Sequence, residues 1–268
     1  MKRVLTIQDL SCLGKCSLTV ALPVLSAMGC CCSVLPTAVL STHTAFPDPT
    51  CRSLTEDLLP VAEHWNRIGA DFDAISIGYL ADPAQAEKVE QVLDLFHAPV
   101  ILDPVMADHG KLYSRLEADH VQAMRQLCRK AKFLLPNVTE AALLTGLSYQ
   151  ESVEEAYLHL LAEKLLSFGV EAAVITGFSW DHGETGFFGM NRQGTSFSYK
   201  ATRIPKHFHG TGDLFAAVFT GSLLSGKEIY DAAELAARFV EQVIGVTEES
   251  TPFGVEFESQ LPWLWQQL

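Results

Sequence analysis

Short, almost continuously apolar segments alternate along this chain with segments in which apolar residues recur at helical spacing. The apolar segments, which are predicted strands, cover residues 3–8, 33–40, 73–78, 99–103, 132–136 and 171–177. The helical spacing predicts helices over residues 17–29, 54–68, 83–96, 118–130, 137–145 and 151–168. Pro23 lies inside the first of these helices and is expected to bend it. Buried strands that alternate with helices predict an α/β fold with a mostly parallel central sheet and helices on both faces.

The alternation changes in the last third of the chain. Residues 183–202 have the pattern of a hairpin, with its turn at residues 191–194. Two long helices are predicted over residues 211–225 and 230–247. The amphipathic end, residues 261–268, is expected to pack its tryptophans against the rest of the protein.

Composition limits the possible partners and location. The chain has 268 residues, 48% of them hydrophobic, so residues 1–268 are predicted to form one domain around a large core. The chain has 19 Lys and Arg but 32 Asp and Glu, which gives a net charge of −13. This charge argues against nucleic acid or an anionic membrane as a partner. No apolar stretch reaches the roughly 18 residues of a membrane span, and the N-terminal apolar run is too short for a signal peptide. The protein is therefore predicted to be cytoplasmic, with its cysteines reduced.

Ligands of open parallel sheets bind at the carboxyl ends of the strands. In this sequence the predicted strands are followed by hydroxyl groups, carboxyl groups and glycines. These positions are Asp9 and residues 41–44, 78–80, 103–110, 136–140 and 176–179. The candidate chemistry is therefore expected at one edge of the sheet.

Residues 210–213, Gly-Thr-Gly-Asp, stand where a glycine turn changes into a predicted helix. Glycines let the backbone approach a ligand closely, and the first N–H groups of a helix have no partner inside it, so this turn predicts an anion site. The Asp213 carboxylate would face the same anion and could act as general base toward an alcohol that attacks a phosphoryl group. The alternative is structural, because an Asp in a first turn also stabilises the helix.

Six motifs in one order make the interpretation more specific. The sequence HGTGDLFAAVFTG, residues 209–221, resembles the signature of the ribokinase-like small-molecule kinases. The other motifs resemble the pyridoxal (vitamin B6) kinase branch of that superfamily; they are LTIQD, STHT, GYL, DPVM and PNVTE. The similarity extends over roughly residues 4–247 and implies a ribokinase-like three-layer sandwich.

The resemblance also implies an activity. A pyridoxal kinase transfers phosphate from ATP to the 5′-hydroxyl of pyridoxal, pyridoxine or pyridoxamine, and it works as a homodimer. Asp213 would be the general base, and the backbone of Gly210, Thr211 and Gly212 would hold the transferring phosphoryl group. The residues that would contact the nucleotide are Asp108, Asn137, Thr176, Gly177 and Thr211.

Asp103 and Glu140 are the candidate ligands of Mg²⁺, directly or through water, because this cation prefers carboxylates, phosphates and water. Structural alternatives stay open for both. Asp103 precedes Pro104, a pair that starts turns, and Asn137 with Glu140 is close to a helix capping box. By family resemblance, residues 108–113 would form a flexible flap.

By the same resemblance, five residues would contact the B6 ring: Asp9, Thr42, His43, Thr44 and Tyr79. Many relatives have serine where this chain has Asp9. A carboxylate there could accept a hydrogen bond from the ring phenol or pair with a protonated ring nitrogen. His209, which precedes the anion loop, is assigned no role.

Two other functions fit the same motifs. A hydroxymethylpyrimidine kinase of thiamine synthesis would share the fold, the anion loop and the base. A non-catalytic ligand-binding protein on this fold would keep the pocket but consume no ATP. The intact Gly-Thr-Gly-Asp sequence argues against the second alternative, because a binding protein needs no base.

Overall fold

A nine-stranded sheet is the centre of the computed structural model, which describes residues 1–44, 46–114, 116–180 and 183–268. The strand order is β11-β10-β9-β8-β5-β4-β1-β2-β3. The strands of this sheet are β1 (Arg3–Leu13), β2 (Cys31–Thr42), β3 (Cys51–Ser53), β4 (Ala74–Ile77), β5 (Val100–Leu102), β8 (Phe133–Leu134), β9 (Ala172–Ile175), β10 (Glu184–Asn191) and β11 (Ser196–Thr202).

The six central strands are parallel, as the sequence predicts. They run from β2 through β1, β4, β5 and β8 to β9. Strands β4, β5, β8 and β9 are buried at every residue, whereas β2 is partly exposed. Antiparallel strands flank them on both sides, β3 beside β2 and β10 beside β9. The predicted hairpin is β10–β11, and the Asn191 side chain closes its turn by accepting hydrogen bonds from the amides of Gln193 and Thr195.

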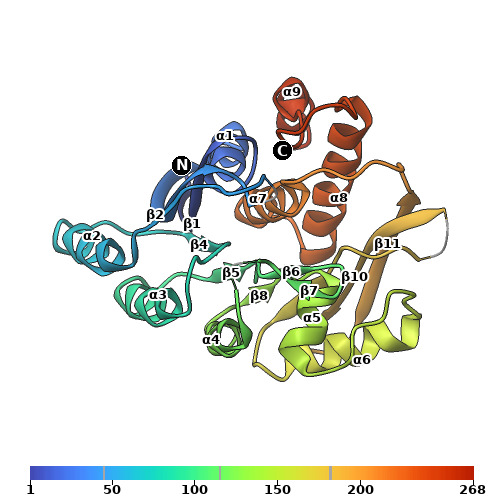
Figure 1. Cartoon of the computed structure of the whole chain (residues 1–268), viewed down its shortest axis with the longest axis horizontal. Coiled ribbons are helices and arrows are strands. Elements are labelled where there is room, and N and C mark those ends of the chain that lie inside the picture. The colour runs from blue at the N-terminus through green and yellow to red at the C-terminus, as the bar shows by residue number, and fades with distance from the viewer. Residues whose placement is uncertain (45, 115, 181–182) are drawn as a thin grey trace.

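Helices cover both faces of the sheet, so the predicted three-layer sandwich is confirmed (Figure 1). The helices are α1 (Leu18–Ala27), α2 (Thr55–Arg67), α3 (Ala84–Leu95), α4 (Ala118–Cys128), α5 (Val138–Thr145), α6 (Glu155–Leu166), α7 (Thr211–Leu224), α8 (Ile229–Val246), η1 (Glu258–Gln260) and α9 (Leu261–Trp265). Helices α1, α7, α8 and α9 lie on one side of the sheet, and α2 to α6 lie on the other. Within the described residues, no helix has both the length and the apolar character needed to cross a membrane.

The first strand is longer than its hydrophobic pattern predicts. β1 pairs with β4 only as far as Ile7, but its pairing with β2 continues to Leu13 after an irregularity between Gln8 and Leu10. The expectation that Asp9 follows the strand is therefore wrong. The extension was hidden because Asp9 and Ser11 are polar although both are buried.

Other differences are local. Helix α6 begins at Glu155, four residues after the predicted start. In α9, Trp263 stacks on Phe239 with ring centroids 6.0 Å apart, as expected, but Trp265 is 64% exposed. The predicted flap contains a small hairpin of β6 (Ala107–Asp108) and β7 (Lys111–Leu112).

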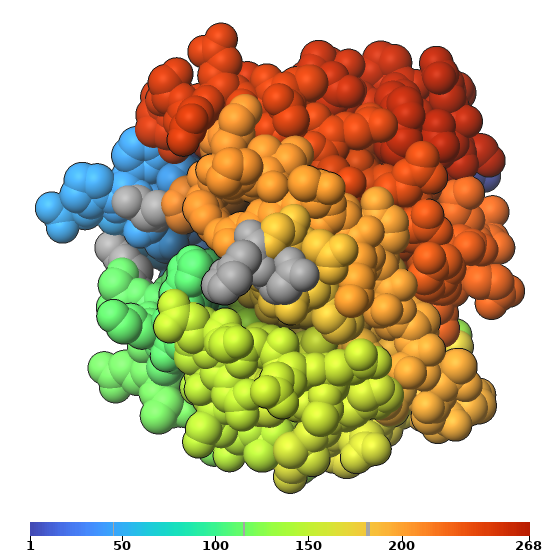
Figure 2. All heavy atoms as spheres, turned by 90° about the vertical axis from the view of Figure 1, so that its right-hand side faces the viewer, coloured from blue at the N-terminus to red at the C-terminus, as the bar shows by residue number. Residues whose placement is uncertain are grey.

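The loops at the carboxyl ends of the parallel strands gather at one edge of the sheet. In Figure 2 the light-blue segment around residue 50, the green segment of the β6–β7 hairpin and the orange segment before α7 lie around a recess in the surface. The candidate site lies at this edge.

Candidate active site

The anion loop begins at Gly210, the N-cap of α7, which has a left-handed φ of 87°. The first amide of α7 with a backbone partner is that of Leu214, which donates to the Gly210 carbonyl at 2.9 Å. Within the described chain, the amides of Thr211, Gly212 and Asp213 donate to no acceptor. Three N–H groups at the positive end of a helix are therefore free to bind an anion.

The shape of this loop depends on a close approach of two backbones. A Cβ at Gly210 would overlap the carbonyl oxygen of Lys15, which lies in the loop between β1 and α1. Only glycine accommodates both this approach and the left-handed φ. Around Gly212, leaving aside its own helix, the one atom of the described residues within 4 Å of an added Cβ is Oδ2 of Asp103, at 3.8 Å. The space above the free amides therefore faces a carboxylate.

Asp213 is in the first turn of α7 and is half-buried. Burial, followed by the charge of Asp9, raises the pKa of its carboxyl to about 6, although the nearby Ser17 amide opposes the shift. A carboxylate with this pKa is ionised at neutral pH yet is a stronger base than an ordinary Asp.

Asp9 is a buried carboxylate, 3% exposed, on the far part of β1. The Ser11 hydroxyl donates to its Oδ2 at 2.9 Å, and the Ser17 side chain is near enough to lower the pKa of this carboxyl. Burial nevertheless raises the pKa of Asp9. The influence of Asp9 on the pKa of Asp213 places the two carboxyls in the same environment.

Asp103 and Glu140 complete a group of buried acids. Burial raises the pKa of Asp103 well above its ordinary value, and the charges of Glu140 and Asp213 add to the shift. Burial also raises the pKa of Glu140 to about 8, despite hydrogen bonds from backbone amides. The phenol of Tyr113 faces the same acids, and its pKa is raised by burial and by their charges.

The capping box predicted for α5 is present. The Asn137 side chain accepts from the Glu140 amide at 2.9 Å, and the Glu140 carboxylate accepts from the Asn137 amide at 2.9 Å. The other carboxylate oxygen of Glu140 accepts from the Met106 amide at 3.0 Å. Since both oxygens of Glu140 already accept hydrogen bonds, Glu140 is better placed to act on a cation through water than as a direct ligand.

The predicted nucleotide residues lie at the ends of neighbouring strands. Asn137 and Thr176 form a bridge beyond β8 and β9, and the Thr176 carbonyl accepts from the Val138 amide. Gly177 has a φ of 72°, and a Cβ there would lie 2.9 Å from Cβ of Asn137. The Asn137 amide group donates to the Ala107 carbonyl at 2.8 Å, which ties β6 to this edge. Asp108 is exposed on β6.

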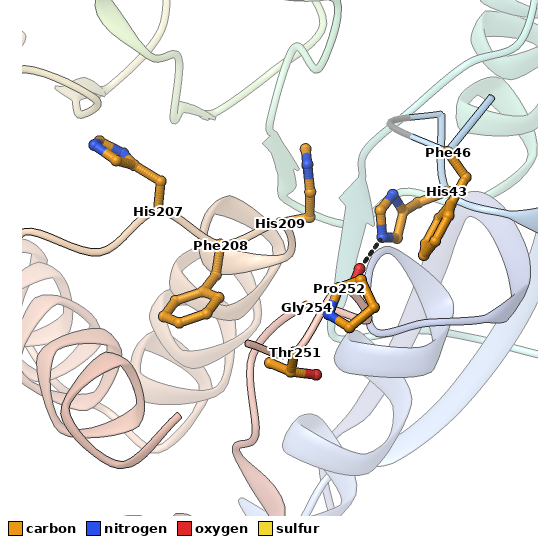
Figure 3. Close-up of a pocket in the computed structure, with 8 residues that line it drawn as sticks. All are labelled: His43, Phe46, His207, Phe208, His209, Thr251, Pro252 and Gly254. Carbon is orange, nitrogen blue, oxygen red and sulfur yellow. Dashed lines mark hydrogen bonds between the residues drawn. The ribbon is translucent and has the colours of Figure 1, made fainter. Parts of the chain in front are cut away.

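The predicted substrate residues are divided between two places. His43 lines a pocket of about 290 Å³, together with Phe46, His207, Phe208, His209, Thr251, Pro252 and Gly254 (Figure 3). Its ring lies 4.6 Å from that of His209, and its Nε2 is 3.3 Å from the Pro252 carbonyl oxygen. Because a carbonyl only accepts, that nitrogen donates.

The other four predicted substrate residues do not line this pocket, and Asp9 lies on β1 as described above. Thr42 ends β2 opposite Leu13, and Thr44 is half-buried in the loop that follows. Tyr79 is only 6% exposed and lies in the core cluster next to Leu80.

Sequence reasoning missed a segment that joins several of these loops. Residues 252–255, which we name the strap, contact Lys15, His43 and His209 through backbone atoms. The Lys15 amide donates to the Phe253 carbonyl at 2.7 Å, and the Val255 amide donates to the His209 carbonyl at 3.3 Å. The available sequence signal for the strap was its glycine, Gly254, a residue type that allows the left-handed φ of 92° found there.

Side chains between β1 and α1 were also missed. Cys16 lies close enough to Asp213 and Asp9 for their charges to raise the pKa of its thiol, although burial is the larger cause. Ser17 lies near enough to both acids to lower their pKa values. A serine directly before an apolar helical segment was the available signal.

The acids fit a magnesium site that is completed by ligands from outside the protein. In the part of the chain that the structure describes, no group of three or more His, Cys, Asp or Glu residues could hold a metal ion. Asp103 instead offers a carboxylate beside the free amides. Mg²⁺ commonly binds one or two carboxylates and takes its other ligands from phosphates and water.

Comparison with known proteins gives a consistent class. A family model described as phosphomethylpyrimidine kinase matches residues 22–257. The hydroxymethylpyrimidine/phosphomethylpyrimidine kinase of Bacillus subtilis (strain 168) is 32% identical over 178 residues, which cover 64% of this chain and 63% of that relative.

Two solved structures match over nearly the whole chain. The pyridoxal kinase from Lactobacillus plantarum has 33% identity and a TM-score of 0.91, with 100% of this chain and 98% of that chain covered. A Bacteroides thetaiotaomicron protein, assigned as a phosphomethylpyrimidine kinase and solved with pyridoxal, has 33% identity and a TM-score of 0.94, with 98% of this chain and 95% of that chain covered.

Fold and site therefore define a small-molecule kinase with a ribokinase-like fold, as the motifs predict. The chain belongs to the phosphomethylpyrimidine kinase family. The resemblance to pyridoxal kinases is confirmed by homologues and by structure.

Proposed function

We propose that this protein transfers the γ-phosphoryl group of ATP to the 5′-hydroxyl of pyridoxal, pyridoxine or pyridoxamine. The observation on which the proposal rests is the set of three free amides, at Thr211, Gly212 and Asp213, beside a carboxylate whose pKa is raised to about 6. The likeness to a pyridoxal kinase over the whole chain supports B6 vitamers as the substrates.

In the proposed reaction, the Asp213 carboxylate takes the proton of the substrate hydroxyl as its oxygen attacks the γ-phosphorus. The bond from that phosphorus to the β–γ bridging oxygen breaks, and ADP leaves. Charge builds on the phosphoryl oxygens, where the free amides donate hydrogen bonds; such stabilisation is usually the largest catalytic contribution. Asp108, Asn137, Thr176 and Gly177 would contact the nucleotide.

The buried acids require a cation next to the triphosphate. Asp103 would hold Mg²⁺, and Glu140 would orient it through water. When bound, the ion neutralises charge on the phosphate oxygens. Without it, the acids would repel ATP.

Asp9, Thr42, His43, Thr44 and Tyr79 would surround the vitamin ring. We further propose that residues 1–268 form one domain, since one sheet includes strands from Arg3 to Thr202, and that the protein is a cytoplasmic homodimer. Size-exclusion chromatography with light scattering measures the oligomeric state.

A substrate panel tests the proposal. With MgATP we expect the three B6 vitamers to be phosphorylated with kcat/KM values at least about tenfold above that of hydroxymethylpyrimidine. The measurement is detection of the phosphorylated product by mass spectrometry. A higher value for the pyrimidine would favour the hydroxymethylpyrimidine kinase alternative, and no ATP consumption with any alcohol would favour the binding protein.

The pKa of Asp213 predicts the pH dependence of the reaction. The base must be ionised, so we expect kcat/KM for the vitamer to fall about tenfold per pH unit below about 6 and to level off above it. The measurement is a pH profile from about 5 to 8, roughly one unit below that pKa and two units above it. A profile whose acid side instead follows the ordinary pKa of Asp, near 3.8, would contradict the assignment.

The carboxylate of Asp103 predicts how the protein responds to metal. We expect Mg²⁺ to raise the Tm of the nucleotide-free protein by reducing repulsion among the acids, and Asp103→Asn to raise the Mg²⁺ concentration for half-maximal activity by about tenfold or more. Differential scanning fluorimetry and a Mg²⁺ titration measure the two effects. Asp94→Asn, at an exposed Asp paired with Lys130, is the matched control and should change neither.

A further inference from the structure

The tip of the β6–β7 hairpin is held by residues of α5 and of the loop after it. The hairpin has a two-residue turn, His109 and Gly110, in which both residues have a left-handed φ, of 49° and 75°. The Gly110 amide donates to the Thr139 hydroxyl at 3.0 Å. Gly110 also packs against Tyr149, because a Cβ at Gly110 would lie 2.7 Å from Cδ1 of that ring. A hydroxyl group and an aromatic ring therefore fix the tip.

The hydroxyl of Thr139 is not needed to start α5. Thr139 lies in the first turn of this helix and is 2% exposed. That turn is already capped by Asn137 and Glu140, each of whose side chains accepts a hydrogen bond from the backbone amide of the other. A side chain in a buried turn that is capped in this way needs only to pack. The Thr139 hydroxyl is therefore explained by the hairpin amide from which it accepts.

Asp108, which is proposed to contact the nucleotide, follows the position of the tip. It pairs with Lys111 across the turn, and its Oδ1 accepts from the His109 amide at 2.8 Å. Its Oδ2 lies 3.6 Å from Nε2 of His109. The turn itself sets the direction of this carboxylate, so a displaced tip displaces the carboxylate as well.

The tip lies close to the segment that precedes the anion loop. The ring centroids of His109 and His207 are 6.4 Å apart. In Figure 2 the green hairpin and the orange segment before α7 both border the recess. A carboxylate in this place must be positioned accurately, because it repels a triphosphate unless a cation or a hydroxyl group lies between them.

We infer that Thr139 is a positioning residue, whose hydroxyl holds the tip of the β6–β7 hairpin and thereby sets the place of Asp108 at the nucleotide site. The inference rests on the proposed function, in which Asp108 contacts ATP. Thr139 acts through Gly110 and the turn, without touching the nucleotide. Its effect is therefore expected in ATP binding rather than in the transfer step.

Thr139→Val removes the hydroxyl and keeps the shape of the side chain. We expect the ATP KM to rise about tenfold, because the Gly110 amide loses its acceptor. The vitamer KM, and kcat at saturating ATP, should stay within about twofold, because the base and the anion loop are unchanged. In the nucleotide-free protein, the amides of residues 106–113 should exchange with deuterium at least about tenfold faster. Steady-state kinetics and mass spectrometry measure these effects.

Three further variants complete the design. Thr139→Ser retains the hydroxyl, so the ATP KM and the exchange rates should stay within about twofold of those of the unaltered protein. Thr145→Val, near the other end of α5, is the matched control, because its hydroxyl donates to the Ala141 carbonyl at 2.7 Å within the helix. It should change neither quantity. In an Asp108→Asn background, Thr139→Val should no longer raise the ATP KM, because the carboxylate that it positions is gone.

An unchanged ATP KM in Thr139→Val would overturn the inference. Rises of equal size in Thr139→Val and Thr145→Val, the signature of a structural role, would also overturn it, and so would a full rise in the Asp108→Asn background. Failure of the proposed function is distinguishable, because the unaltered protein would then phosphorylate no vitamer. Hydrogen exchange needs no turnover, and equal exchange in Thr139→Val and the unaltered protein would overturn the inference in that case too.

Discussion

Replacement of Asp213 by asparagine is expected to lower kcat for vitamer phosphorylation by about 10²–10⁴-fold, the contribution of a positioned general base. Asparagine has nearly the same shape and keeps an acceptor oxygen near the Ser17 amide, so the geometry of the first turn of α7 should be retained. The amides of the anion loop are also unchanged. Vitamer and ATP binding, measured by calorimetry, should therefore stay within about threefold of the unaltered protein.

The stability of this variant separates loss of the base from loss of the fold. The folded-state pKa of Asp213, about 6, is above the ordinary value of 3.8, so the protonated carboxyl favours the folded state and the ionised one opposes it. The stabilisation from the protonated carboxyl is lost as the pH rises from 3.8 to about 6. At pH 7.5 the asparagine variant should then have an equal or higher Tm. Asp231→Asn, in the first turn of the neighbouring helix α8, is the matched control and should retain full activity. Near-normal turnover of Asp213→Asn would exclude Asp213 as the base.

The layers of the fold were predictable because the central strands are short and apolar on both faces. Ala74–Ile77 and Ala172–Ile175 are fully buried. Parallel strands that are buried on both faces need helices to cover them, and the connections between the strands supply these helices. The small strands gave no such signal. β3 has three residues, and β6 and β7 have two each, so they depend on their neighbours rather than on a pattern.

The site was predictable only as far as topology brings strand ends together. Asp103 and Asn137 lie together for that reason, whereas Asp213 reaches the same place from the first turn of α7. The strap and Ser17 were not predictable in the same way. The strap meets Lys15 across more than two hundred residues of chain, with a hydrogen bond of 2.7 Å between Lys15 and Phe253. The left-handed φ of Ser17 was not predictable because serine does not favour it.

The second large effect is expected from Gly210→Ala. An alanine at a φ of 87° is strained, and its Cβ would overlap the Lys15 carbonyl oxygen. Val255 lies 3.5 Å from the same Cβ position, so the side chain cannot be accommodated by a small rotation of the loop. The anion loop must therefore move away from Lys15, and the free amides move with it. Displacement of positioned groups by about 1 Å can lower rates about 10²-fold, and we expect a loss of that size in kcat/KM.

Gly226→Ala is the control that isolates the close approach, because it lies just beyond the other end of the same helix. Gly226 has a φ of 96°, so alanine there is strained to a similar degree, but apart from its chain neighbours no atom of the described residues lies within 4 Å of the added Cβ. Both variants should lose some stability, while only Gly210→Ala should lose kcat/KM. Equal activity in the two variants would show that the contact between Gly210 and Lys15 does not shape the phosphoryl site. A selective loss with Gly210→Ala would instead mean that the β1–α1 loop sets the position of the free amides, and that vitamer and phosphoryl binding depend on one backbone contact.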